Sequence, residues 1–145
     1  MTPKQIERAY KGRIKKILKS IGKELATSGY VCGKPEDQSD ENPCWALFVQ
    51  NEQEAKGDDG EGVDIRFEIL ISEDTDGKPN GVAFSIGITS TQGNIIGGMT
   101  PGNYSKDLWV DRKDTDAIEA RFELFEQADS GEIVYLLDKF HNRTV

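Results

Sequence analysis

With 145 residues, the chain is long enough to bury a core without disulfides or a metal, and we expect a single domain over residues 1–145. Its hydrophobic fraction of 36% is modest, but the apolar residues recur with regular periods, which excludes a disordered chain. No apolar run approaches the length of a membrane span and no apolar segment follows Met1, so we expect a cytoplasmic protein.

The net charge of −8 is distributed unevenly along the chain. Residues 1–27 contain eight Lys and Arg against two Glu, a balance of +6, whereas the remaining residues have a balance of −14. The acidic residues gather in the segments 36–41 and 52–64 and towards the C-terminus. Because binding to nucleic acid by counterion release needs a dominant positive surface, this composition disfavours a nucleic-acid-binding protein.

A first helix is predicted from about Pro3 to about Ser28, because proline suits the first turn and Gly29 suits a left-handed stop. Apolar residues recur along it at spacings of three and four: Ile6, Tyr10, Ile14, Ile17, Leu18, Ile21 and Leu25. A second stripe at the same period is basic: Lys4, Arg8, Lys11, Lys15 and Lys19. We expect the apolar stripe to pack on the domain and the basic stripe to face outward.

The next segments are predicted as loop, strand and loop. Residues 33–43 have no period and are expected to form a loop, and residues 44–50 alternate as a strand does. Residues 51–61 are expected to form an acidic loop. Cys32 and Cys44 lie twelve residues apart, without a Cys-x-x-Cys pattern, so a disulfide between them would need an oxidising compartment.

The strongest pattern in the chain is a long hairpin over Val63 to Thr89. Its first arm alternates without a break, and its second arm places four large apolar residues on one face. Pairing Glu73 with Asn80 brings the alternating apolar residues of both arms to the same side, which predicts the register: Ile71 opposite Val82, Ile69 opposite Phe84, Phe67 opposite Ile86 and Ile65 opposite Ile88.

The same register defines the opposite face of the hairpin, which we call the outer face. Arg66 lies opposite Gly87 there, Glu68 lies opposite Ser85 and Asp64 lies opposite Thr89. A glycine within a strand often marks close approach by another backbone or a ligand, so Arg66 and Glu68 are candidate contacts for a partner. A plain solvent face is an equally good interpretation.

After Thr89 the periodic pattern weakens until two closing helices begin. Asn94–Ile96 is predicted as a short strand, and Asp107–Val110 is predicted as either a last short strand or an extended lead-in to the next helix. Tyr104 and Trp109 are candidate aromatic anchors for a partner. The patterns at 116–119 and 129–132 have the form of capping boxes, each followed by apolar residues at helical spacing. We therefore predict an α+β fold: an antiparallel sheet of three to five strands built on the hairpin, with one N-terminal and two C-terminal helices packed on it.

The motifs of catalysis and of metal binding are weak. His141 is the only histidine, and its place near the end of the last helix favours a cation at a helix C-terminus over a general base. The acidic turn at 74–79 fails the EF-hand pattern at both ends, and residues 93–102 lack the ending of a P-loop. We therefore expect no metal and no cofactor, and calcium should leave the melting temperature unchanged.

These observations favour a small, acidic, non-enzymatic interaction protein that recognises a basic protein partner, such as an inhibitor, an immunity-type binder or an adaptor. Two alternatives stay open. One is an enzyme that uses dispersed carboxylates, and the other is an accessory protein that contacts nucleic acid or a membrane surface through the basic first helix.

Overall fold

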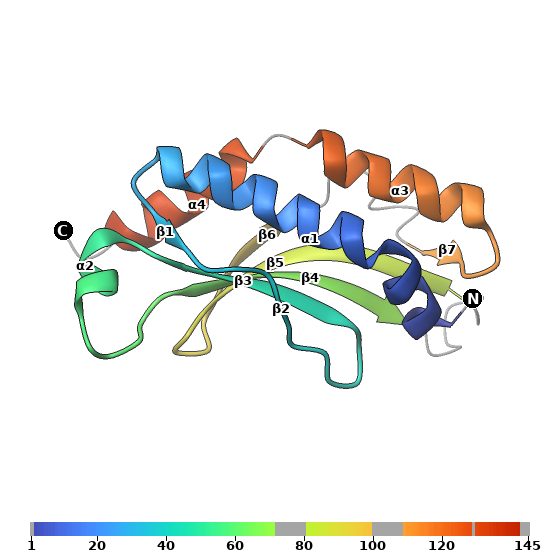
Figure 1. Cartoon of the computed structure of the whole chain (residues 1–145), viewed down its shortest axis with the longest axis horizontal. Helices are drawn as coiled ribbons and strands as arrows, with labels where there is room; N and C mark the ends of the chain where they lie inside the picture. The colour runs from blue at the N-terminus through green and yellow to red at the C-terminus, as the bar shows by residue number, and fades with distance from the viewer. Residues whose placement is uncertain (1, 72–80, 100–108, 129, 143–145) are drawn as a thin grey trace.

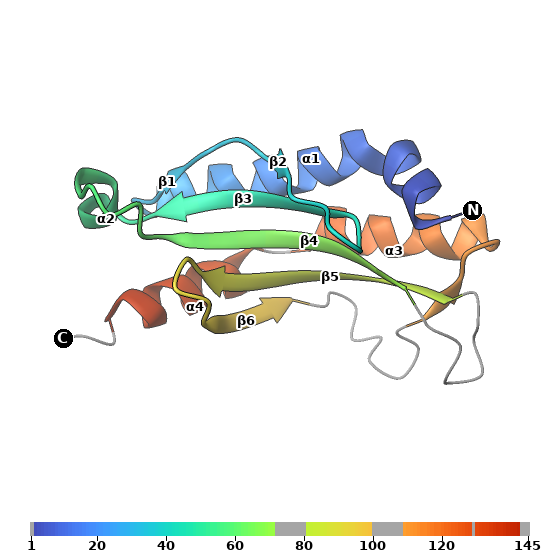
Figure 2. The ribbon, with the colours of Figure 1, turned by 90° about the horizontal axis from the view of Figure 1, so that it is seen from below.

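The structure is a computed structural model that describes residues 2–71, 81–99, 109–128 and 130–142. It contains one antiparallel sheet, and its three long helices all lie on one side of that sheet (Figures 1 and 2). One of these helices is N-terminal and two are C-terminal, so the predicted α+β fold class is confirmed.

Helix α1 (Pro3–Thr27) begins and ends where the sequence predicts. The Gln5 backbone N–H donates to Thr2 Oγ1 at 3.1 Å, while the Thr2 N–H donates to the Gln5 side chain at 2.8 Å, which completes a capping box. Gly29 follows with a φ of 91°, the left-handed conformation that glycine adopts at little cost. All seven residues of the predicted apolar stripe are buried, so α1 is part of the core.

The sheet has the strand order β1-β3-β4-β5-β6, and two further short strands join it at β3 and β5. The strands are β1 (Val31–Cys32), β2 (Glu36–Asp37), β3 (Cys44–Gln50), β4 (Val63–Ile71), β5 (Gly81–Ser90), β6 (Ile95–Met99) and β7 (Val110–Asp111). The predicted hairpin is β4 and β5, and its register is the predicted one, with Ile69 opposite Phe84 and Arg66 opposite Gly87. The predicted turn at 74–79 lies outside the described residues.

The loop predicted over residues 33–43 is wrong in one part, because β2 pairs there with β3. Strand β1 was not predicted either. Each of these strands has only two residues, and both owe their structure to pairing with β3. Neither carries a period of its own that a sequence pattern could reveal.

The closing segments also differ from the predicted boundaries. Strand β6 runs further than the predicted strand over Asn94–Ile96, and β7 begins at Val110, where the predicted strand ends. Helix α3 (Thr115–Gln127) starts before the predicted capping box at 116–119, since the side chain of Asp114 accepts from the Ala117 N–H at 3.1 Å. Helix α4 (Gly131–His141) has Ser130 at its N-cap, without a side-chain capping bond.

The core lies between the helices and the inner face of the sheet. Tyr10 of α1 stacks on Phe122 of α3, with ring centroids 4.3 Å apart, and Phe122 in turn contacts Phe67 and Phe84 of the hairpin. Arg13 of α1 forms ion pairs with Glu119 and Glu126 of α3 beside these rings. The same packing explains Gly22 within α1, because a Cβ at that position would lie 3.3 Å from Leu47 Cδ2.

Candidate functional site

Exposed carboxylates gather at the end of the sheet where β3 meets β4, which we call the acidic end. It comprises residues 51–62 and contains five acidic side chains against Lys56. Glu52, Asp58, Asp59 and Glu61 are exposed, and Glu54 is partly buried. The sequence therefore identified the charge of this segment, but its structure has to be corrected.

The predicted acidic loop contains a short helix, α2 (Glu52–Lys56). The Asn51 side chain accepts from the Glu54 backbone N–H at 2.8 Å, and Glu54 Oε1 accepts from the Asn51 N–H at 2.9 Å. This is a capping box, and the Asn-x-x-Glu pattern at 51–54 was a signal that could have predicted it. No residue of α2 is buried, so other contacts must hold it against the domain.

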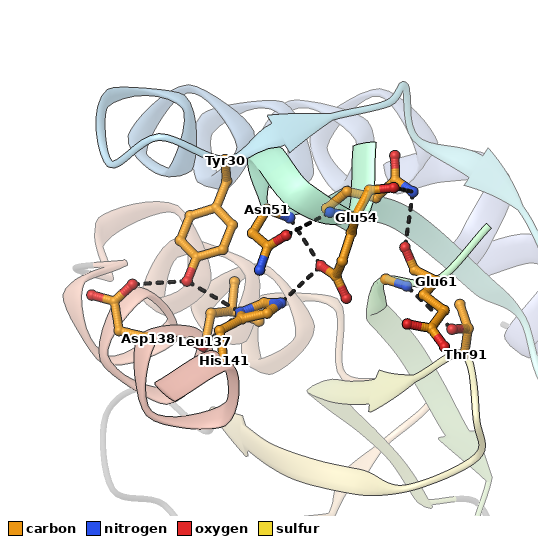
Figure 3. A network of polar contacts seen from close by, with 10 residues as sticks. Tyr30, Asn51, Glu54, Glu61, Thr91, Leu137, Asp138 and His141 are labelled. Carbon is orange, nitrogen blue, oxygen red and sulfur yellow. Dashed lines mark hydrogen bonds and ion pairs between the residues drawn. The ribbon is translucent and has the colours of Figure 1, made fainter. Parts of the chain in front are cut away.

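His141 provides such a contact from the last turn of α4 (Figure 3). Its Nε2 lies 2.8 Å from Glu54 Oε1, and its Nδ1 lies 2.8 Å from the Leu137 carbonyl oxygen. A carbonyl can only accept a hydrogen bond, so Nδ1 must carry a proton, and Nε2 also faces an acceptor. The imidazole ring therefore joins the Leu137 carbonyl to the Glu54 carboxyl group, and the His141 and Glu54 side chains are only 11% and 15% exposed.

Tyr30 and Asp138 extend this network on the other side of His141 (Figure 3). The Tyr30 hydroxyl donates to Asp138 Oδ1 at 2.7 Å and lies 3.4 Å from His141 Nδ1. Burial raises the pKa of Tyr30 above its ordinary value, and the bond to Asp138 raises it further. The hydroxyl therefore stays protonated at neutral pH. Its hydrogen bond to Asp138 connects α4 to Tyr30, the residue just before β1.

Two cavities flank this network. One has a volume of about 410 Å³ and is lined in part by Tyr30, Glu52, Asp138 and His141. The other has a volume of about 360 Å³ and a lining that includes Glu54, Glu61 and Phe140. Each lining includes two acidic residues and several other hydrogen-bonding groups, a chemistry that suits an ammonium or guanidinium group. Sequence reasoning had weighed His141 but missed Tyr30, Glu54 and Asp138 as its neighbours.

The outer face of the sheet holds two of the predicted contact residues. Arg66 Nε lies 3.2 Å from Glu68 Oε1 as an ion pair, without the alignment of a hydrogen bond, and both side chains are partly exposed. Next to them on β4, burial raises the pKa of Asp64, an effect that Arg66 partly offsets. A Cβ at Gly87, opposite Arg66, would meet no atom within 4 Å, so nothing in the described chain requires glycine there.

The structure does not gather all predicted contacts into one patch. Trp109 precedes β7, which pairs with β5 at Gly81 and Val82, whereas Arg66 pairs with Gly87. Five residues of strand separate the two places, or roughly 17 Å at a rise of about 3.4 Å per residue. Trp109 is partly buried, and Tyr104 lies outside the described residues.

The basic stripe of α1 is exposed at Lys4, Arg8, Lys11 and Lys19 and partly buried at Lys15. Lys11 and Lys15 also place their Nζ atoms over the ring of the buried Trp45, 5.3 and 4.8 Å from its centroid. Two of the five stripe residues thus make cation–π contacts within the domain. The predicted outward orientation is therefore correct for most of the basic stripe, but Lys11 and Lys15 also pack on the domain through Trp45.

Three further observations concern metals, membranes and thiols. Within the ranges that the structure describes, no three His, Cys, Asp or Glu side chains are grouped so as to hold a metal ion. No described helix is both long enough and apolar enough to cross a membrane. Cys32 and Cys44 are both free thiols. Cys32 of β1 lies opposite Val49, near the end of β3, whereas Cys44 begins β3 and lies opposite Glu68 of β4.

Comparison with known proteins finds no matching family model, no matching curated protein and no matching solved structure.

Proposed function

We propose that this chain is a small, acidic, non-enzymatic interaction protein that recognises a basic protein partner, and that the acidic end is the centre of its binding surface. The observation that carries this proposal is the grouping of exposed carboxylates beside two cavities. Such a surface attracts a positively charged partner over long range and speeds the encounter. A Lys or Arg side chain of the partner would enter a cavity and meet Glu61 or Asp138.

The network around His141 supports a binding role over a catalytic one. Both ring nitrogens of His141 are already in contact, one with the Leu137 carbonyl and one with Glu54, and the Tyr30 hydroxyl donates a hydrogen bond to Asp138. A general base needs a nitrogen within reach of the proton that it removes. The network instead fixes α2 and α4 next to each other, and a preorganised surface lowers the entropic cost of binding.

The outer face offers a second contact area for the same partner. Arg66, Glu68 and the open space at Gly87 would receive a partner's backbone, and Trp109 would contribute at the far end of β5. The alternative that uses the basic stripe of α1 has less support, because Lys11 and Lys15 already contact Trp45.

The test begins with a pulldown from the native cell, followed by measurement of the association rate with the recovered partner. The rate should fall steeply between about 50 mM and about 500 mM salt, because added salt screens charges beyond a Debye length of about 10 Å at 0.1 M. A partner whose association rate does not depend on salt would contradict the proposal.

Two triple variants with the same net charge localise the surface. The first neutralises three exposed residues of the acidic end: Glu52→Gln, Asp58→Asn and Asp59→Asn. The matched control neutralises three exposed acidic residues on α1 and α3: Glu24→Gln, Asp116→Asn and Glu123→Gln. We expect only the first to slow association, by about tenfold or more. Arg66→Ala should weaken the complex as well, and equal effects of the two triple variants would exclude the acidic end as the binding surface.

A further inference from the structure

Strand β6 ends the sheet on one side, and its second edge pairs with none of the described strands (Figure 2). An unpaired edge presents a row of backbone N–H and C=O groups to which another strand can bond. Proteins usually guard such edges with charged residues, with proline or with very short strands. The opposite side of this sheet follows that rule, because β2 has only two residues, Glu36 and Asp37, and both are exposed.

Strand β6, with five residues, contains neither a charged residue nor a proline. Its sequence, Ile-Ile-Gly-Gly-Met, has no charge, and it lies within a run from residue 79 to residue 105 that contains no Asp, Glu, Lys or Arg, although 30% of the whole chain is charged. Ile95, at the start of β6, is 84% exposed. Depletion of charge at an exposed apolar site is typical of the centre of a protein interface.

The glycines of β6 have internal explanations and do not contribute to this inference. A Cβ at Gly97 would lie 3.0 Å from Leu136 of α4, and a Cβ at Gly98 would lie 2.9 Å from the Ile86 carbonyl oxygen. The first contact is nevertheless informative about α4, because it places Leu136 directly against the middle of β6.

Helix α4 carries complementary charges on either side of Leu136. Glu132 precedes Leu136 by four residues and Lys139 follows it by three, so all three lie on one stripe of the helix. Both charged side chains are exposed. Tyr135, next to Leu136, is 62% exposed, so two of the three large hydrophobic side chains exposed in the described part of the chain belong to β6 and α4.

We infer that β6 is the interface of a homodimer, in which β6 pairs antiparallel with β6 of a second copy about a two-fold axis near Gly97. A two-fold axis makes paired strands antiparallel and repeats every contact twice. With Leu136 over the middle of β6, the axis brings Glu132 of each copy towards Lys139 of the other. The chain's own charge of −8 opposes self-association, but β6 itself brings no charged residue to the seam.

Sedimentation equilibrium of the full chain across about a hundredfold concentration range tests this inference, because a homodimer dissociates on dilution by mass action. We expect a monomer–dimer equilibrium. Ile95→Lys should weaken the dimer by at least about tenfold, since a lysine on an edge strand opposes pairing. The melting temperature of this variant should change little, because Ile95 is exposed.

Charge exchange on α4 then tests the two-fold arrangement. Glu132→Lys and Lys139→Glu should each weaken the dimer, and the double variant should restore it, because every copy then again presents opposite charges. Glu123→Lys, on the exposed surface of α3, changes the net charge as Glu132→Lys does and should have little effect.

Three outcomes would overturn the homodimer. The first is a chain that stays monomeric at every concentration. The second is a dimer whose affinity is unchanged both by Ile95→Lys and by the charge exchange on α4. The third is a monomer whose β6 amides become protected from hydrogen exchange only when another protein is added, which would assign this edge to a different partner.

Discussion

His141 Nε2 lies 2.8 Å from Glu54 Oε1, and this contact joins the last turn of α4 to the first turn of α2, across 87 positions of sequence. The same oxygen of Glu54 completes the capping box of α2. A helix of five residues without a buried side chain is not stable on its own. The contact with His141 therefore stabilises the acidic end from the last helix of the chain.

Replacing His141 by alanine should detach α2 from α4, while the sheet stays folded. We expect a loss of about 1–3 kcal/mol in the free energy of unfolding, because Glu54 loses a hydrogen-bond partner at a mostly buried position. Hydrogen exchange of the amides at 53–57 should accelerate. Asn142→Ala, at the exposed next position, is the control, and unchanged exchange in His141→Ala would show that α2 is held by other contacts.

Tyr30 should make the stability of the protein depend on alkaline pH. Its pKa is raised in the folded state, so the folded protein keeps the hydroxyl proton more tightly than the unfolded chain does. The corresponding stabilisation is complete below the unfolded pKa of about 10 and is lost as the pH rises above it. Unfolding curves should therefore show the wild type losing stability above about pH 10 relative to Tyr30→Phe, and parallel pH profiles would contradict the role given to this hydroxyl.

The hairpin register predicts a large difference between two neighbouring positions on β4. Ile69 is 1% exposed on the inner face, and Ile69→Ala should lower the free energy of unfolding by about 2–5 kcal/mol, because it leaves a cavity in the core. Leu70 lies on the outer face and is only partly buried, so Leu70→Ala should cost clearly less. Denaturant titrations that rank the two variants in the opposite order would contradict the assignment of faces.

Two glycines at the sheet should respond to alanine in opposite ways. A Cβ at Gly62 would lie 2.6 Å from the Val49 carbonyl oxygen, so Gly62→Ala must displace backbone and should destabilise by about 1–3 kcal/mol. Gly87 has open space, and alanine there should be neutral or stabilise by up to about 1 kcal/mol, because glycine within a strand is entropically costly. Thermal denaturation distinguishes these results, and a strongly destabilised Gly87→Ala would reveal a constraint that the structure does not contain.

The sequence by itself determined the parts of this protein whose signal is local and repeated. The apolar stripe of α1 and the alternation in β4 and β5 are periods of the chain, and a period identifies the buried face of a helix or strand wherever that element packs. The hairpin register also follows from the sequence, because a shift by one residue would turn Ile69 and its apolar neighbours to the outer face. The uneven charge, with a basic first helix and an acidic body, is likewise a property of composition.

Tertiary structure alone decided which distant residues meet. The two-residue strands β1 and β2 exist because β3 offers them partners, and the contact of His141 with Glu54 exists because α4 ends where α2 begins. The position of β6 at the end of the described sheet and the contact of Leu136 with its middle are also consequences of packing order. Such contacts depend on how all the elements pack together. A single side chain is not part of a periodic pattern, so the sequence alone does not predict its distant partner.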